Sequence, residues 1–524
     1  MIGNFFHWRT SLTKSGQGGY LTLPVLFLAI FNIVFHFAFS GNLEYHRDEL
    51  LYFSLGMHPD FGYSTVPPFI GWVAGLVGSL FGYSVYAVRI VPALLSGAMI
   101  LLVSAMTKEL AGSRYAQLLA AIGLTVSTFF MRSYSLFHPV HLEISLWTLC
   151  IFFILRYVNT SRDKYLILLG IFTGVTLLNK YLAIVFFASL LLVVPFSMHR
   201  HIFSRKMFWF GLGAGFIVFL PNLIWQFVHG IPSIKHIGEL YDTQLVHMDI
   251  PLFLSEQFMM PFLGTIFTIA GLVYLFTGEK SKRYRFLGFT VAGVIIILML
   301  LKGKGYYTLG VFPFLISAGA VGWSMLLKKR WSKILFPSLI VLFTLPVVPM
   351  GLPVLGKEAL KEYFHRLDTR YHIDVGRRFE DGSIHSLPQD YADMIGWEEL
   401  TLAANKAWQM VIDKEAAFIY AENYGQAGAI TVIGKKYGLP QAVCFSESFL
   451  YWMPRDFEKE ITSMVYINDE PGSDVKALFK KITLVGGITD PDARELGTSV
   501  WLCEEPVKSF NSMWKERISS LGRN

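Results

Sequence analysis

Long apolar blocks alternate with short polar segments along the first 350 or so residues of the chain. A helix needs about 20 mostly apolar residues to cross a bilayer, and most of these blocks approach that length. The pattern predicts eleven membrane-spanning helices, of which the fifth and sixth are separated only by Asn179 and Lys180. The predicted spans cover residues 20–40, 86–107, 115–133, 138–157, 164–179, 181–197, 207–227, 258–277, 285–301, 307–327 and 333–351.

Three further features of the pattern refine this picture. The first block is expected to stay on the chain, because it is longer than a signal-peptide core and Ala38-Phe39-Ser40 is a poor cleavage site. Two connecting segments, 41–85 and 228–257, are too polar to span. They combine aromatics, prolines and charges, which favours amphipathic segments lying on the membrane surface.

The apolar blocks stop near residue 351, and short strand-like and helix-like runs follow to the end of the chain. The sequence therefore predicts a transmembrane domain, 1–351, and a small α/β domain, 352–524. Within the second domain a helix is expected at Gln426–Tyr437. The expected strands are Ala416–Ala421, Gln441–Phe445, Met464–Asn468, Ile482–Val485 and Ser499–Cys503.

Composition agrees with a polytopic membrane protein and excludes a soluble one of this length. The chain is 53% hydrophobic and only 16% charged, whereas soluble domains carry about 25% charged residues. The net charge of +7 does not indicate nucleic-acid binding, because the basic residues lie in short clusters between apolar blocks.

The basic clusters predict the orientation in the membrane. With the N-terminus in the cytoplasm, eighteen lysines and arginines, beginning with Arg9 and Lys14, fall on the inner side of the first 351 residues and seven on the outer side. An odd number of spans then places residues 352–524 outside. Since no organelle signal is visible, we expect a bacterial inner membrane with a periplasmic C-terminal domain.

The three cysteines, Cys150, Cys444 and Cys503, form no CxxC pair, so a zinc or redox motif is not indicated. Cys444 and Cys503 end predicted strands in an oxidising compartment, where a disulfide is an alternative. Their apolar neighbours favour buried free thiols.

The first outer segment begins with an acidic group that suggests chemistry. Asp48 and Glu49 follow shortly after the first span. A carboxylate at this depth raises the free energy of the protein unless water solvates it, so its presence can also indicate a function. Plain interface charge is the simpler interpretation of both. A carboxylate at this position would also serve as the base that glycosyl transfer to a hydroxyl requires.

Several short motifs follow in a fixed order, and together they resemble one family. They are Pro67-Pro68, Phe81-Gly82, Arg89, Pro139-Val140-His141-Leu142-Glu143, Asn179-Lys180-Tyr181, Pro221-Asn222-Leu223-Ile224-Trp225-Gln226, Gly303-Lys304-Gly305-Tyr306-Tyr307 and Asn423-Tyr424-Gly425-Gln426-Ala427-Gly428. With the acidic pair, this series resembles bacterial membrane glycosyltransferases related to the protein O-mannosyltransferases, including the lipid A aminoarabinose transferases. Their architecture is called GT-C.

The resemblance implies inverting transfer of a sugar from a polyprenyl monophosphate to an acceptor hydroxyl. It makes Asp48 the candidate base, with Glu49 and Glu143 as further catalytic carboxylates. The charge of the leaving phosphate calls for fixed cations, and the candidates for binding it are Arg89, Lys180, Lys302, Lys304, Tyr306 and Tyr307. Further site candidates are Arg47, His138, His141, Tyr181, Asn222 and Gln226.

The same residues could also have roles outside catalysis. The lysines could reach toward lipid headgroups, the tyrosines could belong to an interfacial aromatic belt, and His141 with Glu143 could cap a span. No cofactor is expected, although Asp48, Glu49, His141 and Glu143 include the ligand types of a divalent ion.

The sequence departs from the family at two positions near the expected site. Val66 stands where a histidine or lysine often precedes Pro-Pro, and Glu143 stands where aspartate is frequent. The sugar is therefore open, as is the acceptor, which could be a glycolipid, a glycan or a protein. The expected partners are the lipid-linked donor, membrane lipids and this acceptor. The main alternative function is a lipid or sugar transporter or flippase, but no internal repeat is visible.

Overall fold

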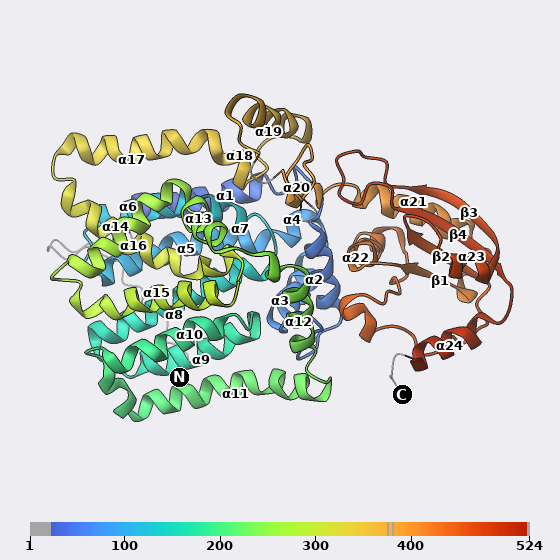
Figure 1. The fold of residues 1–524 in the computed structure, drawn as a ribbon, viewed down its shortest axis with the longest axis horizontal. Helices are drawn as coiled ribbons and strands as arrows, with labels where there is room; N and C mark the ends of the chain where they lie inside the picture. Colours follow the sequence, from blue (N-terminus) through green and yellow to red (C-terminus); the bar gives the residue numbers. More distant parts are fainter. Residues whose placement is uncertain (1–21, 375–376, 380–381, 521–524) are drawn as a thin grey trace.

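The computed structural model describes residues 22–374, 377–379 and 382–520. A body of roughly parallel helices forms one end of the molecule, and a smaller domain with a β-sheet forms the other (Figure 1). Arg9, Lys14 and the start of the first predicted span lie outside the described residues.

Each of the eleven predicted spans is helical over most of its described length. The body contains α1 (Leu23–Ala38), α5 (Ile90–Glu109), α6 (Arg114–Thr125), α7 (Thr128–Ser133), α8 (Pro139–Thr160), α9 (Lys164–Asn179), α10 (Ala183–Val193), α11 (Lys206–Val228), α14 (Thr265–Thr277), α15 (Arg285–Leu300), α16 (Phe312–Leu326), α17 (Arg330–Thr344) and α18 (Val348–Gly351). Short 3₁₀ turns join them at η1 (Val194–Phe196), η2 (Arg200–Ser204), η4 (Phe262–Gly264), η5 (Lys282–Tyr284), η6 (Gly305–Val311) and η7 (Leu345–Val347).

The chain is a multi-pass membrane protein. Six helical segments of the described chain are long and apolar enough to cross a bilayer, and a seventh candidate is a pair of helices bent by 88° between Met259 and Phe262. Shorter apolar helices at Leu23–Ala38, Lys164–Asn179 and Ala183–Phe196 correspond to other predicted spans. The total of eleven therefore stays a prediction.

Small residues let some of these helices approach closely. A Cβ on Gly170 of α9 would lie 1.9 Å from the carbonyl oxygen of Gly211 on α11, and one on Gly319 of α16 would lie equally close to that of Phe267 on α14. Close backbone approach of this kind is how helices gain packing energy in lipid, where the hydrophobic effect between them is absent.

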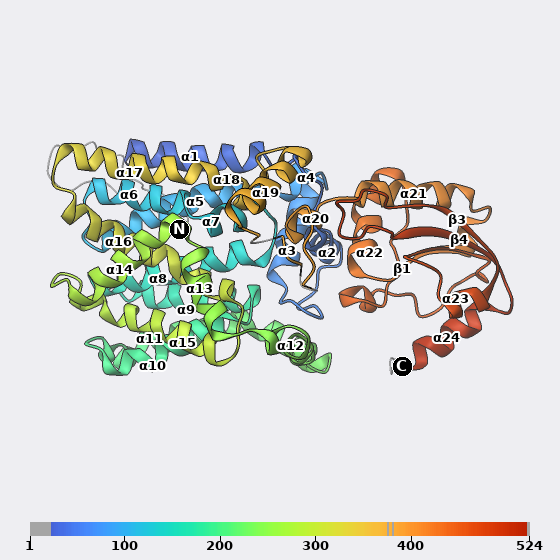
Figure 2. The ribbon, with the colours of Figure 1, turned by 45° about the horizontal axis from the view of Figure 1, so that its top comes forward.

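The two long polar segments fold as short helices at one end of the body. The first forms α2 (Arg47–Met57), α3 (Phe69–Phe81) and α4 (Val85–Val88), and the second forms α12 (Pro232–Thr243), η3 (Leu245–His247) and α13 (Ile250–Met259). In both views α2 and α3 lie between the helical body and the C-terminal domain (Figures 1 and 2).

The C-terminal domain is the predicted small α/β unit. Its elements are α19 (Lys357–Tyr371), α20 (Gln389–Ala392), α21 (Trp397–Met410), η8 (Lys414–Ala416), β1 (Ala417–Ala421), α22 (Tyr424–Val432), η9 (Gly434–Tyr437), η10 (Glu447–Tyr451), β2 (Ser463–Asn468), α23 (Ser473–Leu478), β3 (Phe479–Gly487), β4 (Ser499–Pro506) and α24 (Phe510–Ser520). The sheet order is β1-β2-β4-β3, with β1 and β2 parallel and the other pairs antiparallel.

One predicted strand is wrong. Only Val443 of the segment Gln441–Phe445 pairs with β1, through a single bridge to Tyr420. Pro440 lacks an N–H for a ladder, and the chain turns into η10 directly afterwards. Cys444 and Cys503 are buried free thiols, as their apolar neighbours predicted.

The hydrophobic core of the C-terminal domain continues into the first long polar segment, 41–85. Leu50 and Phe53 of α2 belong to the same buried cluster as Leu400 of α21 and Leu502 of β4. The contact between α2 and α22 is close, because a Cβ on Gly428 would lie 2.8 Å from the Cβ of Leu50. Helix α2 is therefore packed on both sides, and the C-terminal domain is part of its fold.

We expect Gly428→Ala to loosen this junction. The added methyl overpacks the contact with Leu50 and should cost about 1–3 kcal/mol, which thermal unfolding of the purified protein in detergent would detect. Gly213→Ala in α11 is the matched control, because a Cβ there meets nothing within 4 Å. Equal melting temperatures for the two variants would contradict the close contact.

Candidate active site

Three helices begin at one point, where the body meets the C-terminal domain. Asp48 is the second residue of α2, His138 is the N-cap of α8, and Tyr424 is the first residue of α22. Each of these helices opens with a capping box, in which the N-cap side chain and the third helical residue satisfy each other's backbone N–H groups. Converging helix N-termini create a positive potential that favours ionised carboxylates and bound anions.

Asp48 is held by one partner from each of the other two helices. Its Oδ1 accepts a hydrogen bond from the Tyr424 hydroxyl at 2.9 Å, and its Oδ2 lies 3.4 Å from His138 Nε2. His138 Nδ1 accepts the Val140 N–H at 3.3 Å, so the proton of the neutral ring sits on Nε2 and is directed at Asp48. About a quarter of the Asp48 side chain, 27%, remains exposed.

The environment of Asp48 favours its charged form. Burial by itself raises the pKa of this carboxyl, but the hydrogen bond from His138, the nearby imidazoles of His46 and His138 and the Tyr424 hydroxyl together hold the pKa well below its usual range. Asp48 is therefore an ionised carboxylate with one accessible side, which is the state a general base needs before it takes a proton.

Glu49 and Arg89 form a buried ion pair and do not face the exposed side of Asp48. Arg89 donates to both Glu49 oxygens, at 2.7–3.2 Å, and the two side chains are only 1% and 2% exposed. Arg89 also donates to the carbonyls of Ser40 and Glu44. Glu49 accepts the N–H of Phe137 at 2.9 Å. This network fixes the start of α2 and therefore the position of Asp48. The guanidinium of Arg89 and the carboxylate of Glu49 are both engaged in these hydrogen bonds.

A second cluster brings together residues from α8, α9 and η6. Lys180 Nζ lies 3.2 Å from Glu143 Oε2 and sits over the rings of Tyr306 and Tyr307, at 5.1 and 4.8 Å from their centroids. Lys180 is 22% exposed, whereas Glu143 is 3% exposed and its Oε1 has no hydrogen-bond partner among the described residues. The ammonium is thus fixed by a buried carboxylate and by two aromatic faces.

Tyr52 of α2 lies beside Asp48 and His138. It is four residues after Asp48 on the same helix face, and its ring packs edge-on against His138 at 5.5 Å. Burial raises the pKa of Tyr52 well above its usual value. The nearby groups that raise it further are Asp48, Tyr424, Tyr306 and Glu447.

Other predicted site residues form hydrogen bonds that join the helices around the Asp48 and Lys180 clusters. Tyr181 donates to Asn222 at 2.8 Å, and Asn222 donates to the Phe61 carbonyl at 2.7 Å, which ties α9 and α11 to the first outer segment. Gln226 accepts from Ser233 at 2.9 Å and so holds the start of α12. His141 is fully buried and accepts the His138 N–H through Nδ1 at 3.3 Å.

Lys302 and Lys304 contact the second outer segment. Lys302 donates to the Val246 carbonyl at 3.2 Å, and Lys304 donates to Gln244 at 2.5 Å. Lys302 lines a largely apolar cavity of about 270 Å³. The other lining residues are Met248, Asp249, Ile250, Phe253, Met299, Leu300 and Gly303.

The carboxylates considered for a metal ion already have other partners: Asp48 lies against His138 and Tyr424, Glu49 against Arg89, and Glu143 against Lys180. Within the described ranges, no three His, Cys, Asp or Glu side chains are arranged to hold a metal ion.

Sequence reasoning did not assign Tyr424 to the site. Arg47, which it did include, lies over the Tyr424 ring at 4.4 Å and 3.8 Å from Glu495, so it braces that phenol. The available signal was the box Asn423-x-x-Gln426 after a strand, which marks a helix start. It gives no indication of what the helix faces.

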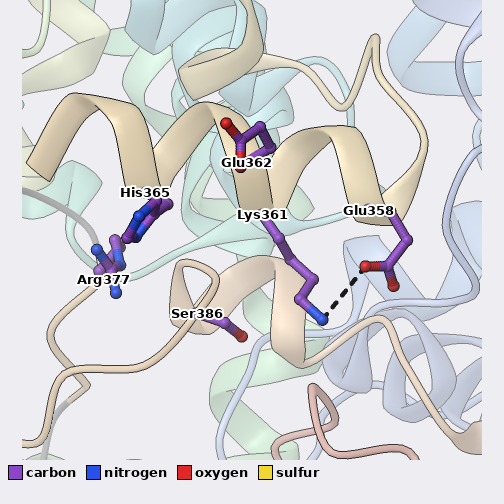
Figure 3. Close-up of a pocket in the computed structure, with 6 residues that line it drawn as sticks. All are labelled: Glu358, Lys361, Glu362, His365, Arg377 and Ser386. Carbon is purple, nitrogen blue, oxygen red and sulfur yellow. Dashed lines mark ion pairs between the residues drawn. The ribbon is translucent and has the colours of Figure 1, made fainter. Parts of the chain in front are cut away.

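Another cavity, of about 340 Å³, lies along α19 and shares no lining residue with the Asp48 cluster (Figure 3). Its main charges are paired with each other or with neighbours. Lys361 bonds to Asp492 at 2.8 Å and lies 3.4 Å from Glu358, and Arg377 bonds to Asp368 at 2.9 Å. These ion pairs already occupy the groups that a charged ligand would need.

Comparison with known proteins concerns the fold. Residues 65–225 match the family model described as dolichyl-phosphate-mannose-protein mannosyltransferase. ArnT from Cupriavidus metallidurans bound to undecaprenyl phosphate is similar over 91% of this chain and 97% of its own, with 14% identity and a TM-score of 0.61. Apo ArnT from the same organism is similar over the same shares, with 13% identity and a TM-score of 0.60. No curated protein sequence matches the chain.

The fold predicted from the ordered motifs is therefore confirmed. Because the match covers 91% of the chain, it takes in much of the C-terminal domain as well as the helical body. The chain has the GT-C fold of these membrane glycosyltransferases, and its residues 65–225 match the model of the dolichyl-phosphate-mannose-protein mannosyltransferases.

Proposed function

We propose that this protein transfers a sugar, with inversion, from a polyprenyl monophosphate to an acceptor hydroxyl at the outer face of a bacterial inner membrane. The observation that carries the proposal is the ionised Asp48, held by His138 and Tyr424 with one side exposed. Tyr52, on the same face of α2, packs against His138. The family match and the undecaprenyl phosphate bound to ArnT support the same donor class.

In this proposal the donor phosphate binds Lys180. Lys180 follows the last residue of α9, and its ammonium lies over the rings of Tyr306 and Tyr307. The Lys180 side chain is partly exposed. The helix N-termini around Asp48 add positive potential for the leaving phosphate. The apolar cavity beside Lys302 suits the isoprenoid chain next to that phosphate.

The transfer needs one base and no covalent intermediate. The acceptor oxygen attacks the anomeric carbon of the sugar, and its proton passes to Asp48. The bond between that carbon and the phosphate oxygen breaks, and its electron pair leaves with the phosphate. Developing positive charge on the sugar ring resembles that in glycoside hydrolysis, and fixed cations stabilise the departing phosphate.

We assign residues 352–524 to an accessory domain on the periplasmic side, with 1–351 as the membrane domain. The basic residues on the opposite, cytoplasmic ends of the helices support this orientation. The accessory domain covers α2 and supplies Tyr424 to Asp48. Its proposed role is therefore to supply the hydrogen bond from Tyr424 to Asp48 and to enclose the acceptor.

Lipid mass spectrometry of a strain with and without the gene tests the proposal. A polyprenyl-phosphate sugar should accumulate in the deletion strain and return to its normal level with the wild-type gene. Purified protein mixed with that lipid extract and an envelope fraction should release free polyprenyl phosphate. A transporter would change the lipid pool without releasing the carrier in detergent, so that outcome would favour transport. An unchanged lipid pool would refute both functions.

A further inference from the structure

A second carboxylate, Glu447, faces the first outer segment from the C-terminal domain. Its Oε2 accepts hydrogen bonds from the hydroxyls of Thr65, at 2.6 Å, and Ser64, at 3.2 Å. The neighbouring Ser448 hydroxyl accepts the Ser64 N–H at 3.0 Å. Ser64 and Thr65 directly precede Val66, and Val66 is the residue at which this chain departs from the family pattern.

The carboxylate is held by one oxygen. Among the described residues, no hydrogen bond to its Oε1 is present, and that atom is not among the fully buried polar atoms. Glu447 also has φ of +55°, a left-handed conformation that is unfavourable for a non-glycine residue. A strained backbone that fixes one carboxylate oxygen and leaves the other accessible is typical of a ligand-binding position.

Glu447 belongs to an element that packs against the helix supplying a partner to the candidate base. Its element, η10, packs against α22, whose first residue donates to Asp48. Burial raises the pKa of Glu447, and the negative charge of Asp48 raises it further, while Thr65, Ser64 and His236 oppose the rise. The neighbouring elements α22 and η10 of the C-terminal domain thus direct Tyr424 and Glu447, respectively, toward the segment that carries Asp48.

Aromatic rings flank this carboxylate. Tyr451, in the same turn as Glu447, packs edge-on against Trp225 and His229, which are stacked with centroids 4.0 Å apart. Trp452 stacks on His58 at the same spacing. Binding sites for neutral polar ligands combine aromatic walls with a few placed hydrogen-bonding groups.

We propose that Glu447 is a specificity-determining residue, which binds a hydroxyl of a carbohydrate acceptor next to the hydroxyl that Asp48 deprotonates. The inference rests on the proposed glycosyl transfer and names its acceptor class. Two carboxylates presented to the same segment suit a molecule with several hydroxyls. They repel an acceptor phosphate, and a serine or threonine of a peptide has a single hydroxyl to offer.

The test compares Glu447→Gln with wild type in the deletion strain. Gln keeps an oxygen for Thr65 and Ser64 but loses the charge. We expect the transferred product to fall about 10-fold or more, because a hydrogen bond to a charged group is lost, while the polyprenyl-phosphate sugar accumulates. Binding of undecaprenyl phosphate by the purified variant should be unchanged. Glu415→Gln, at an exposed carboxylate of the same domain, is the matched control and should behave like wild type.

Linkage analysis of the product provides the second measurement, and a glycosidic bond to a sugar hydroxyl is the expected result. Normal product in Glu447→Gln would overturn the inference, as would a parallel loss of undecaprenyl phosphate binding, which indicates a structural role. A bond to phosphate, serine or threonine would also overturn it. Normal product, a parallel loss of binding, or a bond to serine or threonine leaves the proposed transfer to a hydroxyl intact. A bond to phosphate, or an unchanged lipid pool in the deletion strain, contradicts the transfer itself and this inference with it.

Discussion

Asp48→Asn is expected to lower sugar transfer by about 10²–10⁴-fold, the usual contribution of a general base. Asparagine keeps the shape and accepts the Tyr424 hydroxyl as Asp48 does, but it cannot take the acceptor proton. The purified variant should fold and bind undecaprenyl phosphate as the wild type does, because the phosphate is assigned to Lys180. Turnover of the accumulated lipid donor in detergent measures the loss.

The same assay has a pH signature. The pKa of Asp48 is held below its usual range, so the carboxylate is ionised at every pH above about 4. Its protonation should therefore give no acidic limb in the wild-type rate near neutral pH. The lowered pKa also stabilises the fold. That stability is fully present above the ordinary carboxyl pKa and is lost only as the pH falls through the lower, folded-state value.

Asp60→Asn is the control, because Asp60 is an exposed carboxylate in the same outer segment. It should leave turnover unchanged. Near-normal turnover in Asp48→Asn, with the control also normal, would remove Asp48 from the role of base.

Lys180→Met should abolish most donor binding, and it should also destabilise the protein. The ammonium lies 3.2 Å from the buried Glu143, and removing one partner of a buried ion pair costs roughly 3–5 kcal/mol. Loss of activity in the single variant therefore has two causes. Affinity for undecaprenyl phosphate and the melting temperature should both fall.

The double variant Lys180→Met/Glu143→Gln separates these causes. It removes the unpaired charge, so the melting temperature should recover toward that of wild type. Donor affinity should stay low, because the phosphate still lacks its cation. If the double variant regains normal donor affinity, Lys180 has a structural role, and the donor phosphate binds elsewhere.

The sequence by itself determined the class of the protein and the position of most of its helices. Apolar blocks too long for a soluble core can lower their free energy only as helices in lipid, where every backbone group must bond within its own segment. The β-branched and aromatic runs of the C-terminal domain located its four strands for a similarly local reason. Asp48 and Lys180 could be proposed because charges are costly where apolar segments end.

The tertiary structure decided which charges meet. Arg89 pairs with Glu49, forty residues earlier in the chain. Tyr424 reaches Asp48 across 376 positions of sequence, and Lys180 meets Glu143 from the next helix. Periodicity fixes the face on which a side chain lies, but pairing depends on which helix ends pack together. That packing depends on van der Waals complementarity over the whole molecule, and no local stretch of sequence contains it.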